Sequence, residues 1–181
     1  MPRLLLINGL PGSGKSTLAA RYVAERPLAL CLDIDVVRGL LGAWPDHPHE
    51  SGLLARRLAL AMARLALGEG RDVVVPQFLA RTAFIGELEA LAGELGADFV
   101  EVVLVDPPDV AAARLAQRAA GPLTAVQRDA HLLLDRAGGL DTVPALHRRL
   151  QRVLAGRPDA RRVEPVPGDV ERTYRRLSDC L

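Results

Sequence analysis

A short segment near the start of the chain limits its possible folds more than any other feature. Residues 9–16 read GLPGSGKS and satisfy the pattern G-x-x-x-x-G-K-[ST] at every fixed position. The glycines of this pattern let backbone N–H groups wrap around phosphates, between a strand and a helix. Both elements are predicted here, because Leu4–Asn8 is a short apolar run and Thr17–Glu25 is a helical run.

Each position of this loop has a chemical role when a nucleotide binds. We expect the phosphates to be held by Gly9, Pro11, Gly12, Ser13, Gly14, Lys15, Ser16 and Thr17. Lys15 is predicted to reach the outer phosphates, and the Ser16 hydroxyl to coordinate Mg²⁺. Lys15 is also the only lysine in the chain, and a compact ammonium suits this position better than a planar guanidinium. The loop therefore predicts ATP and Mg²⁺ as cofactors.

The remainder of the chain alternates between short β-rich runs and helical segments. This alternation is typical of a parallel sheet with helices on both faces. The predicted strands are Arg3–Asn8, Leu28–Asp33, Asp72–Pro76, Phe99–Asp106 and Arg161–Val166. We therefore predict an α/β fold of three layers with a five-stranded parallel sheet. A length of 181 residues fits a single domain, and the 49% hydrophobic content can fill one core.

Two stripes of apolar residues recur at helical spacing between the predicted strands. One comprises Leu54, Leu58, Ala61 and Leu65, and the other comprises Leu88, Leu91 and Leu95. Stripes of this kind indicate amphipathic helices, and we expect both to face the core.

The stretch from about residue 118 to residue 156 interrupts the alternation of strands and helices. It has helical patterning broken by glycines, and it contains no predicted strand. An insertion between the fourth and fifth strands is where a mobile lid would lie, so we expect a lid within the single domain of residues 1–181. A plain helical connection is the alternative.

The second predicted strand ends in the sequence DIDVVR, residues 33–38. Ligands of open α/β sheets bind beyond the carboxyl ends of the strands, so these charged residues should lie beside the nucleotide. Asp35 is the candidate base or orienting group for an acceptor hydroxyl, and Asp33 is a candidate Mg²⁺ ligand. Arg38 could hold the acceptor or the transferred phosphoryl group. Alternatively, Asp35 caps the following helix and Arg38 is a solvated charge.

Together, GLPGSGKST and D-I-D-x-x-R resemble the small P-loop kinases of the adenylate-kinase-like group. The likeness is to the chloramphenicol phosphotransferase, zeta-toxin, shikimate kinase and polynucleotide 5′-kinase branches. The resemblance implies the P-loop NTPase fold and an ATP-dependent phosphotransferase with an alcohol group as acceptor. It also implies that the acid matching Asp35 contacts the hydroxyl to be phosphorylated. The polynucleotide kinases carry D-x-x-R as Asp35 and Arg38 appear in this chain.

The third predicted strand departs from the pattern of these relatives, which often have an acid at its tip. This chain reads VVVPQ at residues 73–77, without a carboxylate. Gln77 is a weak metal ligand, so we expect it to position the acceptor or water. Asp33 is therefore the preferred Mg²⁺ partner.

The relatives also supply lid arginines that cover ATP and neutralise charge during transfer. The candidates in this chain are Arg114, Arg118, Arg128 and Arg136. We favour Arg118, because the sequence AAGP directly after it indicates the start of a flap, whereas Arg114 could line only the helix surface. Asp106 is interpreted as a turn former before two prolines.

Charge and cysteine usage restrict the function classes. The formal net charge of +1 removes the strongest reason to expect general nucleic-acid binding. Two isolated cysteines and the lack of a long apolar segment predict a reducing cytoplasm and no membrane association. Segment 44–50, WPDHPHE, lacks convincing metal-ligand spacing. It is read as a loop beside the acceptor with Trp44 as an apolar wall, or as an exposed connection.

The preferred function is an ATP- and Mg²⁺-dependent kinase that phosphorylates a hydroxyl of a small molecule, such as a metabolite or an antibiotic. One alternative is a polynucleotide 5′-hydroxyl kinase, in which Arg56, Arg57 and Arg64 could form a basic track toward Asp35. Another is an ATP-dependent switch or partner-binding module that phosphorylates nothing. The sequence leaves the acceptor and the number of subunits open.

Overall fold

The computed structural model describes the chain from Met1 to Leu181, apart from the side chain of Val126. Five parallel strands form one sheet in the order β2-β3-β1-β4-β5. They are β1 (Arg3–Gly9), β2 (Leu30–Cys31), β3 (Val73–Pro76), β4 (Asp98–Leu104) and β5 (Arg161–Val163). The predicted α/β class and the five-stranded parallel sheet are thus confirmed.

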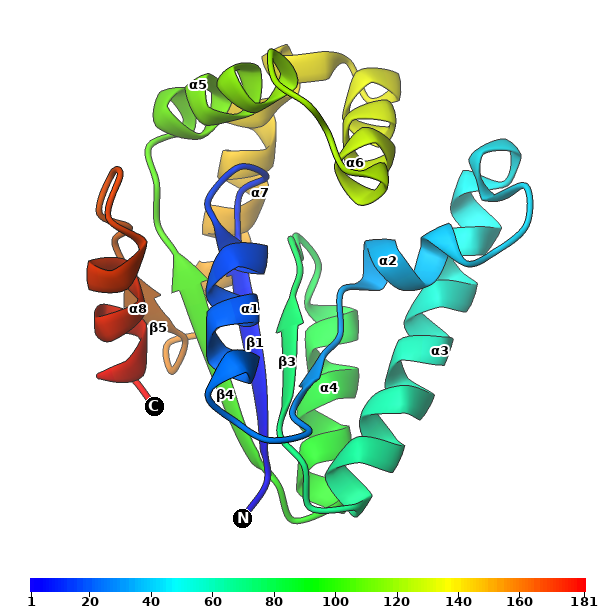
Figure 1. Cartoon of the computed structure of the whole chain (residues 1–181), viewed down its shortest axis with the longest axis vertical. Coiled ribbons are helices and arrows are strands. Elements are labelled where there is room, and N and C mark those ends of the chain that lie inside the picture. Colours follow the sequence, from blue (N-terminus) through cyan, green and yellow to red (C-terminus); the bar gives the residue numbers. More distant parts are fainter.

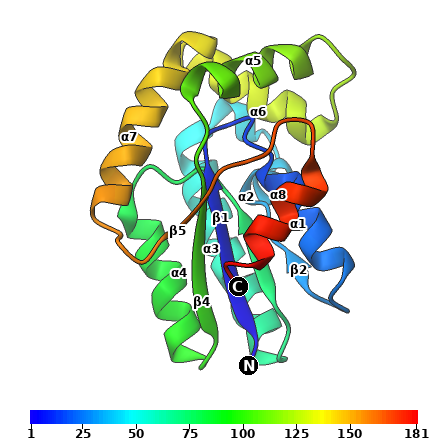
Figure 2. The ribbon, with the colours of Figure 1, turned by 90° about the vertical axis from the view of Figure 1, so that its left-hand side faces the viewer.

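Helices cover both faces of this sheet and one of its ends (Figure 1). They are α1 (Lys15–Ala24), α2 (Ile34–Gly39), α3 (Pro48–Gly68), α4 (Thr82–Glu94), α5 (Pro108–Ala119), α6 (Ala125–Arg136), α7 (Val143–Ala155) and α8 (Val170–Ser178), with 3₁₀ helices η1 (Trp44–Asp46) and η2 (Gly139–Thr142). Seen from the side, α1 and α8 lie on one side of the sheet and α4 on the other (Figure 2).

Strand β1 explains why the sheet needs helices on both faces. Leu4 and Leu6 belong to the core cluster that includes α3 and α4, whereas Leu5 and Ile7 belong to the cluster with α1 and α8. Successive side chains of a strand point to opposite faces, so a strand that is covered on both faces has a continuous apolar run. β1 is therefore buried at the centre of the molecule, and its carboxyl end leads directly into the phosphate-binding loop.

The edge strand β2 is shorter than the predicted strand at residues 28–33. Leu28 has a φ of 63°, a left-handed conformation that is incompatible with a strand. Two hydrogen bonds nevertheless hold this segment beside β3. The Leu30 amide donates to the Asp72 carbonyl and the Leu32 amide to the Val74 carbonyl, both at 2.8 Å. Asp33 follows Leu32 as the N-cap of α2, so β2 still delivers this acid to the carboxyl edge of the sheet.

The predicted orientation of the stripe on α3 was wrong. Leu54, Leu58, Ala61 and Leu65 are exposed, and the face turned to the core carries small residues instead. The core cluster receives Ala55, Ala59, Ala63 and Leu67 from this helix. Alanine lets a helix approach its neighbours closely, and a search for large apolar residues overlooks it. The second stripe does face the core, through Leu88 and Leu91 of α4.

Helices α5, α6 and α7 follow β4 and stand above the carboxyl ends of the strands (Figure 1). No strand interrupts residues 108–155 in the part of the chain that the structure describes, as the sequence predicted for most of this stretch. None of the described helices is both long and apolar enough to cross a membrane.

Candidate active site

The phosphate-binding loop joins β1 to α1, and its glycines have conformations that other residues rarely adopt. Gly14 precedes the first turn of α1 with a φ of 94°. Gly12 has a φ of 83°, and a Cβ atom there would lie 2.9 Å from both the Ala111 carbonyl oxygen and the Leu115 Cγ. The close approach of α5 to the loop therefore requires glycine at position 12.

Lys15 is half-buried at the start of α1. Its Nζ donates hydrogen bonds to the carbonyl oxygens of Gly9 (3.0 Å) and Leu10 (2.8 Å). Burial lowers the pKa of Lys15 to about 8, and the nearby carboxylates of Asp33 and Asp35 oppose that shift. The ammonium is therefore held over the loop and is mostly charged at neutral pH.

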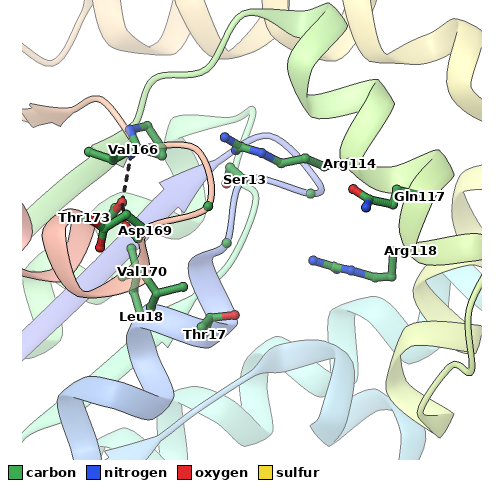
Figure 3. Close-up of a pocket in the computed structure, with 14 residues that line it drawn as sticks. Ser13, Thr17, Leu18, Arg114, Gln117, Arg118, Val166, Asp169, Val170 and Thr173 are labelled. Atoms are coloured by element: carbon green, nitrogen blue, oxygen red, sulfur yellow. Dashed lines mark hydrogen bonds between the residues drawn. The ribbon is translucent and has the colours of Figure 1, made fainter.

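A cavity of about 330 Å³ lies on one side of the loop, between α5 and the segment that joins β5 to α8 (Figure 3). Its lining comprises Gly12, Ser13, Gly14, Thr17, Leu18, Arg114, Gln117, Arg118, Pro165, Val166, Gly168, Asp169, Val170 and Thr173. The Val166 amide donates to the Thr173 hydroxyl (2.8 Å), which fixes the far wall. This wall was not predicted from the sequence. The available signal was the turn sequence PVPG after the last strand, which must reach the same edge of the sheet.

Arg114 does more than line a helix surface. Its Nη1 lies 3.0 Å from both carboxylate oxygens of Asp106, whose side chain is 3% exposed. Burial raises the pKa of Asp106, and the positive charges of Arg114 and Lys15 oppose this. Asp106 was predicted to be a turn former, and its pairing with Arg114 was not predicted. The ion pair fixes Arg114, which Figure 3 shows extending from α5 into the cavity.

A second cavity of about 380 Å³ lies on the other side of the loop and shares Gly12 and Arg118 with the first. Its polar lining includes Lys15, Ser16, Asp33, Asp35, Arg38, Arg56, Gln77, Gln127 and His131, and its apolar lining includes Phe78, Leu115, Leu133, Leu134 and Leu146. The sequence predictions for the acceptor side are thus brought together in one place. The contribution of α6, including His131, was not predicted.

The acids and the arginine after β2 have separate structural roles. Asp33 caps α2, because its Oδ1 accepts a hydrogen bond from the Asp35 amide (2.9 Å). The Asp35 side chain does not cap the helix. Its Oδ1 lies 3.0 Å from Nη1 of Arg38, whose side chain is only 12% exposed. Gln77 donates to the other oxygen of Asp35 at 3.4 Å. The alternative in which Asp35 is the cap and Arg38 is solvated is therefore wrong.

The surroundings of Asp33 change its pKa. Burial raises the pKa of Asp33, and the negative charge of Asp35 adds to this shift. Two neighbouring carboxylates create a place that favours a cation.

Trp44 is buried behind Arg38, with the guanidinium carbon 5.9 Å from its ring centre. Segment 44–50 forms η1 and the first turn of α3. Trp44 is not among the residues that line the second cavity, and its ring instead lies beside Arg38, which does line it. The prediction of Trp44 as a wall of the acceptor site is therefore not confirmed.

The four arginines predicted for the lid have different positions. Arg114 lines the first cavity and Arg118 borders both. Arg128 donates to the Leu123 carbonyl just before its own helix (2.7 Å), and Arg136 donates to the Pro45 carbonyl. Arg136 therefore ties the end of α6 to η1.

The residues at the second cavity fit Mg²⁺ held together with nucleotide phosphates. Among the described residues there is no cluster of three or more His, Cys, Asp or Glu side chains that could hold a metal on its own. Mg²⁺ uses few protein ligands and keeps phosphate oxygens and waters. The Ser16 hydroxyl and the Asp33 carboxylate line the same cavity and supply suitable oxygens.

Residues 4–136 match the family AAA_33, described as an AAA domain. Among the proteins to which the chain is similar in sequence are the uncharacterized proteins Rv2004c of Mycobacterium tuberculosis and Mb2027c of Mycobacterium bovis. Each is 37% identical over 156 residues, which covers 77% of this chain and 30% of the relative. The matched part of this chain thus spans less than a third of these relatives.

Two solved structures have a similar fold over nearly the whole chain. The tunicamycin resistance protein of Deinococcus radiodurans has a TM-score of 0.60 at 18% identity, covering 99% of this chain and 95% of that one. A gluconokinase from Sinorhizobium meliloti 1021 has a TM-score of 0.59 at 18% identity, covering 97% and 89%. These similarities establish the fold.

Proposed function

From the premise that this chain belongs to the AAA_33 family and has a small P-loop kinase fold, we propose that it is an ATP- and Mg²⁺-dependent kinase. We propose further that it transfers the γ-phosphate to a hydroxyl of a small molecule. The main support is that two cavities meet at the phosphate-binding loop and share Gly12 and Arg118. A donor and an acceptor placed in them would meet beside Lys15.

The nucleoside of ATP is assigned to the cavity between α5 and the β5–α8 segment. Its phosphates would then follow the loop toward the N-terminus of α1, where backbone N–H groups and the helix dipole favour negative charge. Lys15 would contact the outer phosphates, with Arg118 on the opposite side. Mg²⁺, held by Ser16 and Asp33, would neutralise charge on the phosphate oxygens.

In the proposed transfer, the acceptor hydroxyl lies against the Asp35 carboxylate. The acceptor oxygen forms a bond to the γ-phosphorus while the bond from that phosphorus to the β–γ bridging oxygen breaks, and ADP leaves. The hydroxyl proton passes to Asp35 and then to solvent. Arg38 and Gln77 orient Asp35 through contacts of 3.0 and 3.4 Å.

The lining of the second cavity supports an acceptor with both an apolar side and hydroxyl groups. Phe78, Leu134 and Leu146 contribute apolar surface, whereas Asp35 and Gln77 contribute hydrogen-bonding groups. A cavity of about 380 Å³ is in the range of small-molecule sites. We propose that the segment from about residue 118 to residue 156 acts as a lid, with α6 as the roof over this acceptor.

The arrangement of arginines favours a small molecule over a polynucleotide. Of the three arginines proposed as a basic track, Arg56 lines the second cavity. Arg64 instead makes two hydrogen bonds to Glu94, at 2.6 and 2.7 Å, and Arg57 is exposed on the outer side of α3. These positions do not form a continuous cationic path toward Asp35.

The test is a transfer screen with γ-labelled ATP. The panel contains polyols, sugar acids, hydroxylated antibiotics including tunicamycin, and a 5′-hydroxyl oligonucleotide. A sugar acid such as gluconate and tunicamycin are included because the two solved structures are named a gluconokinase and a tunicamycin resistance protein. We expect label on a small hydroxyl compound. Label on the oligonucleotide alone would favour the polynucleotide kinase, and equal ATP consumption with and without every acceptor would favour the switch.

A further inference from the structure

The outer face of α3 is an apolar surface that the fold leaves uncovered. Leu54, Leu58 and Leu65 are 44%, 38% and 69% exposed, and Met62 beside them is 41% exposed. α3 lies at one edge of the molecule, with α2 and α4 on its inner side (Figure 1). A row of large apolar side chains on one helix face costs solubility unless something covers it.

The spacing of these residues indicates what covers them. Leu54, Leu58, Ala61 and Leu65 follow one another at intervals of four, three and four residues, which is the pattern of a helix seam that packs against another helix. The intervals are also the same when read backward. Two copies of α3 in antiparallel orientation would therefore pair Leu54 of one copy with Leu65 of the other, and Leu58 with Ala61. Because the pair is symmetric, each of these contacts occurs twice. Each large leucine at the centre would meet a small alanine, as close packing requires.

The charges beside the seam fit the same arrangement. Arg57 and Arg64 are on one flank of α3, and like charges there would repel in a symmetric pair. However, Glu94 of α4 holds Arg64 through two hydrogen bonds and is itself exposed. In the antiparallel pair, Arg57 of one copy would approach the Arg64–Glu94 pair of the other, so that Glu94 offers it a carboxylate.

We propose that the chain forms a two-fold symmetric dimer through the outer faces of α3. Such closed pairs are the commonest oligomers, and they need a surface that is complementary to itself. The dimer leaves both cavities open, because Arg56 and Gly52 face the interior on the other side of α3. Arg56 lines the acceptor cavity there, and Gly52 lies against Arg38.

The first test is sedimentation velocity of the full chain from about 1 to about 100 µM, since association depends on concentration. We expect a shift from monomer to dimer in the wild-type protein. Leu58→Glu and Leu65→Glu should raise the dissociation constant at least about tenfold by burying a charge in the seam. Leu65 is so exposed that its replacement leaves the monomer fold intact, which thermal melting would verify. Leu28→Glu, at an equally exposed leucine away from α3, is the matched control and should dimerise normally.

The second test identifies the helix orientation by oxidation of engineered cysteines. In a Cys31→Ser/Cys180→Ser background, chains with Leu58→Cys are mixed with chains with Ala61→Cys. The antiparallel seam predicts disulfides between the two kinds of chain. Disulfides only within each kind would indicate a parallel pair and overturn the proposal. A monomer at every concentration would also overturn it, as would dimers that survive both glutamate variants.

Discussion

Two opposing influences act on the charge of Lys15. Burial lowers its pKa to about 8, while Asp33 and Asp35 favour the charged ammonium. Triphosphate oxygens close to Nζ would favour the charged form further and raise the pKa again. Nucleotide binding should therefore be linked to proton uptake wherever the free protein has lost this proton.

The sign of the pH dependence follows directly. Well below pH 8 nearly all of Lys15 is already protonated, and ATP binding takes up almost no proton at this group. Above pH 8 the free protein is increasingly neutral at Lys15, so binding takes up a proton and the affinity for ATP falls as the pH rises. Calorimetric titration at about pH 8.5, in two buffers of different ionisation enthalpy, should show net uptake of protons on ATP binding. Lys15→Ala should bind ATP far more weakly than the wild type. An affinity of the wild-type protein for ATP that is constant from about pH 7 to pH 9.5 would contradict the assignment.

Asp33 combines a structural role with a proposed metal role, and one substitution separates them. Asn is as good an N-cap as Asp, so Asp33→Asn should leave thermal stability nearly unchanged. The loss of the negative charge should raise the Mg²⁺ concentration for half-maximal activity several-fold. Asp33→Ala should show both this increase and a stability loss of about 0.5–2 kcal/mol. An unaltered Mg²⁺ requirement in Asp33→Asn would limit Asp33 to capping.

At the scale of elements, the position of α6 depends on contacts at its end. Arg136 donates to the Pro45 carbonyl of η1. If α6 is the proposed roof of the acceptor cavity, this bond would help to hold it in place. Arg136→Gln should therefore raise KM for the acceptor several-fold and leave the dissociation constant of ATP unchanged. Arg128→Gln is the matched control, because Arg128 donates only to Leu123 near its own helix. Equal effects of the two variants on acceptor KM would argue against a lid role for α6.

Elements also show where sequence reasoning succeeds and fails. The loop motif and the apolar strands have strong local signals, so β1, the loop and α1 could be predicted. The orientation of α3 could not, because alanine has little hydrophobic weight and exposed leucines looked like core residues. The pairing of Asp106 with Arg114 depends on how the connection from β4 folds back onto α5. The wall from Pro165 to Thr173 depends on the placement of β5 beside β4. Residue types alone specify neither arrangement.

At the scale of the whole molecule, one ion-paired cluster links β4, α4 and the segment after α7. Glu101 is buried in β4, with its side chain 3% exposed, and it accepts a hydrogen bond from Arg157, which also bonds Glu89 of α4 at 3.1 Å. Arg157→Ala would leave a buried carboxylate without a partner. The free energy of unfolding should fall by about 3–5 kcal/mol, as measured by denaturant titration.

A second variant distinguishes the loss of the pair from general damage. Glu101→Leu/Arg157→Leu removes both charges, so it should recover much of the stability that Arg157→Ala loses. Arg64→Ala, which breaks an exposed pair with Glu94, should change stability little. A double variant as unstable as Arg157→Ala would mean that packing, rather than the unpaired charge, causes the loss.

The proposed kinase reaction depends on Asp35, which lines the second cavity. The most direct measurement compares ATP affinity with the amount of phosphorylated acceptor formed per ADP, for wild type and Asp35→Asn. We predict equal amounts of ADP and phosphorylated acceptor in the wild type. Asp35→Asn should bind ATP within about twofold of wild type but transfer phosphate about 10²–10⁴ times more slowly. Transfer at the wild-type rate by Asp35→Asn, or ADP formation that is independent of every acceptor, would contradict the account.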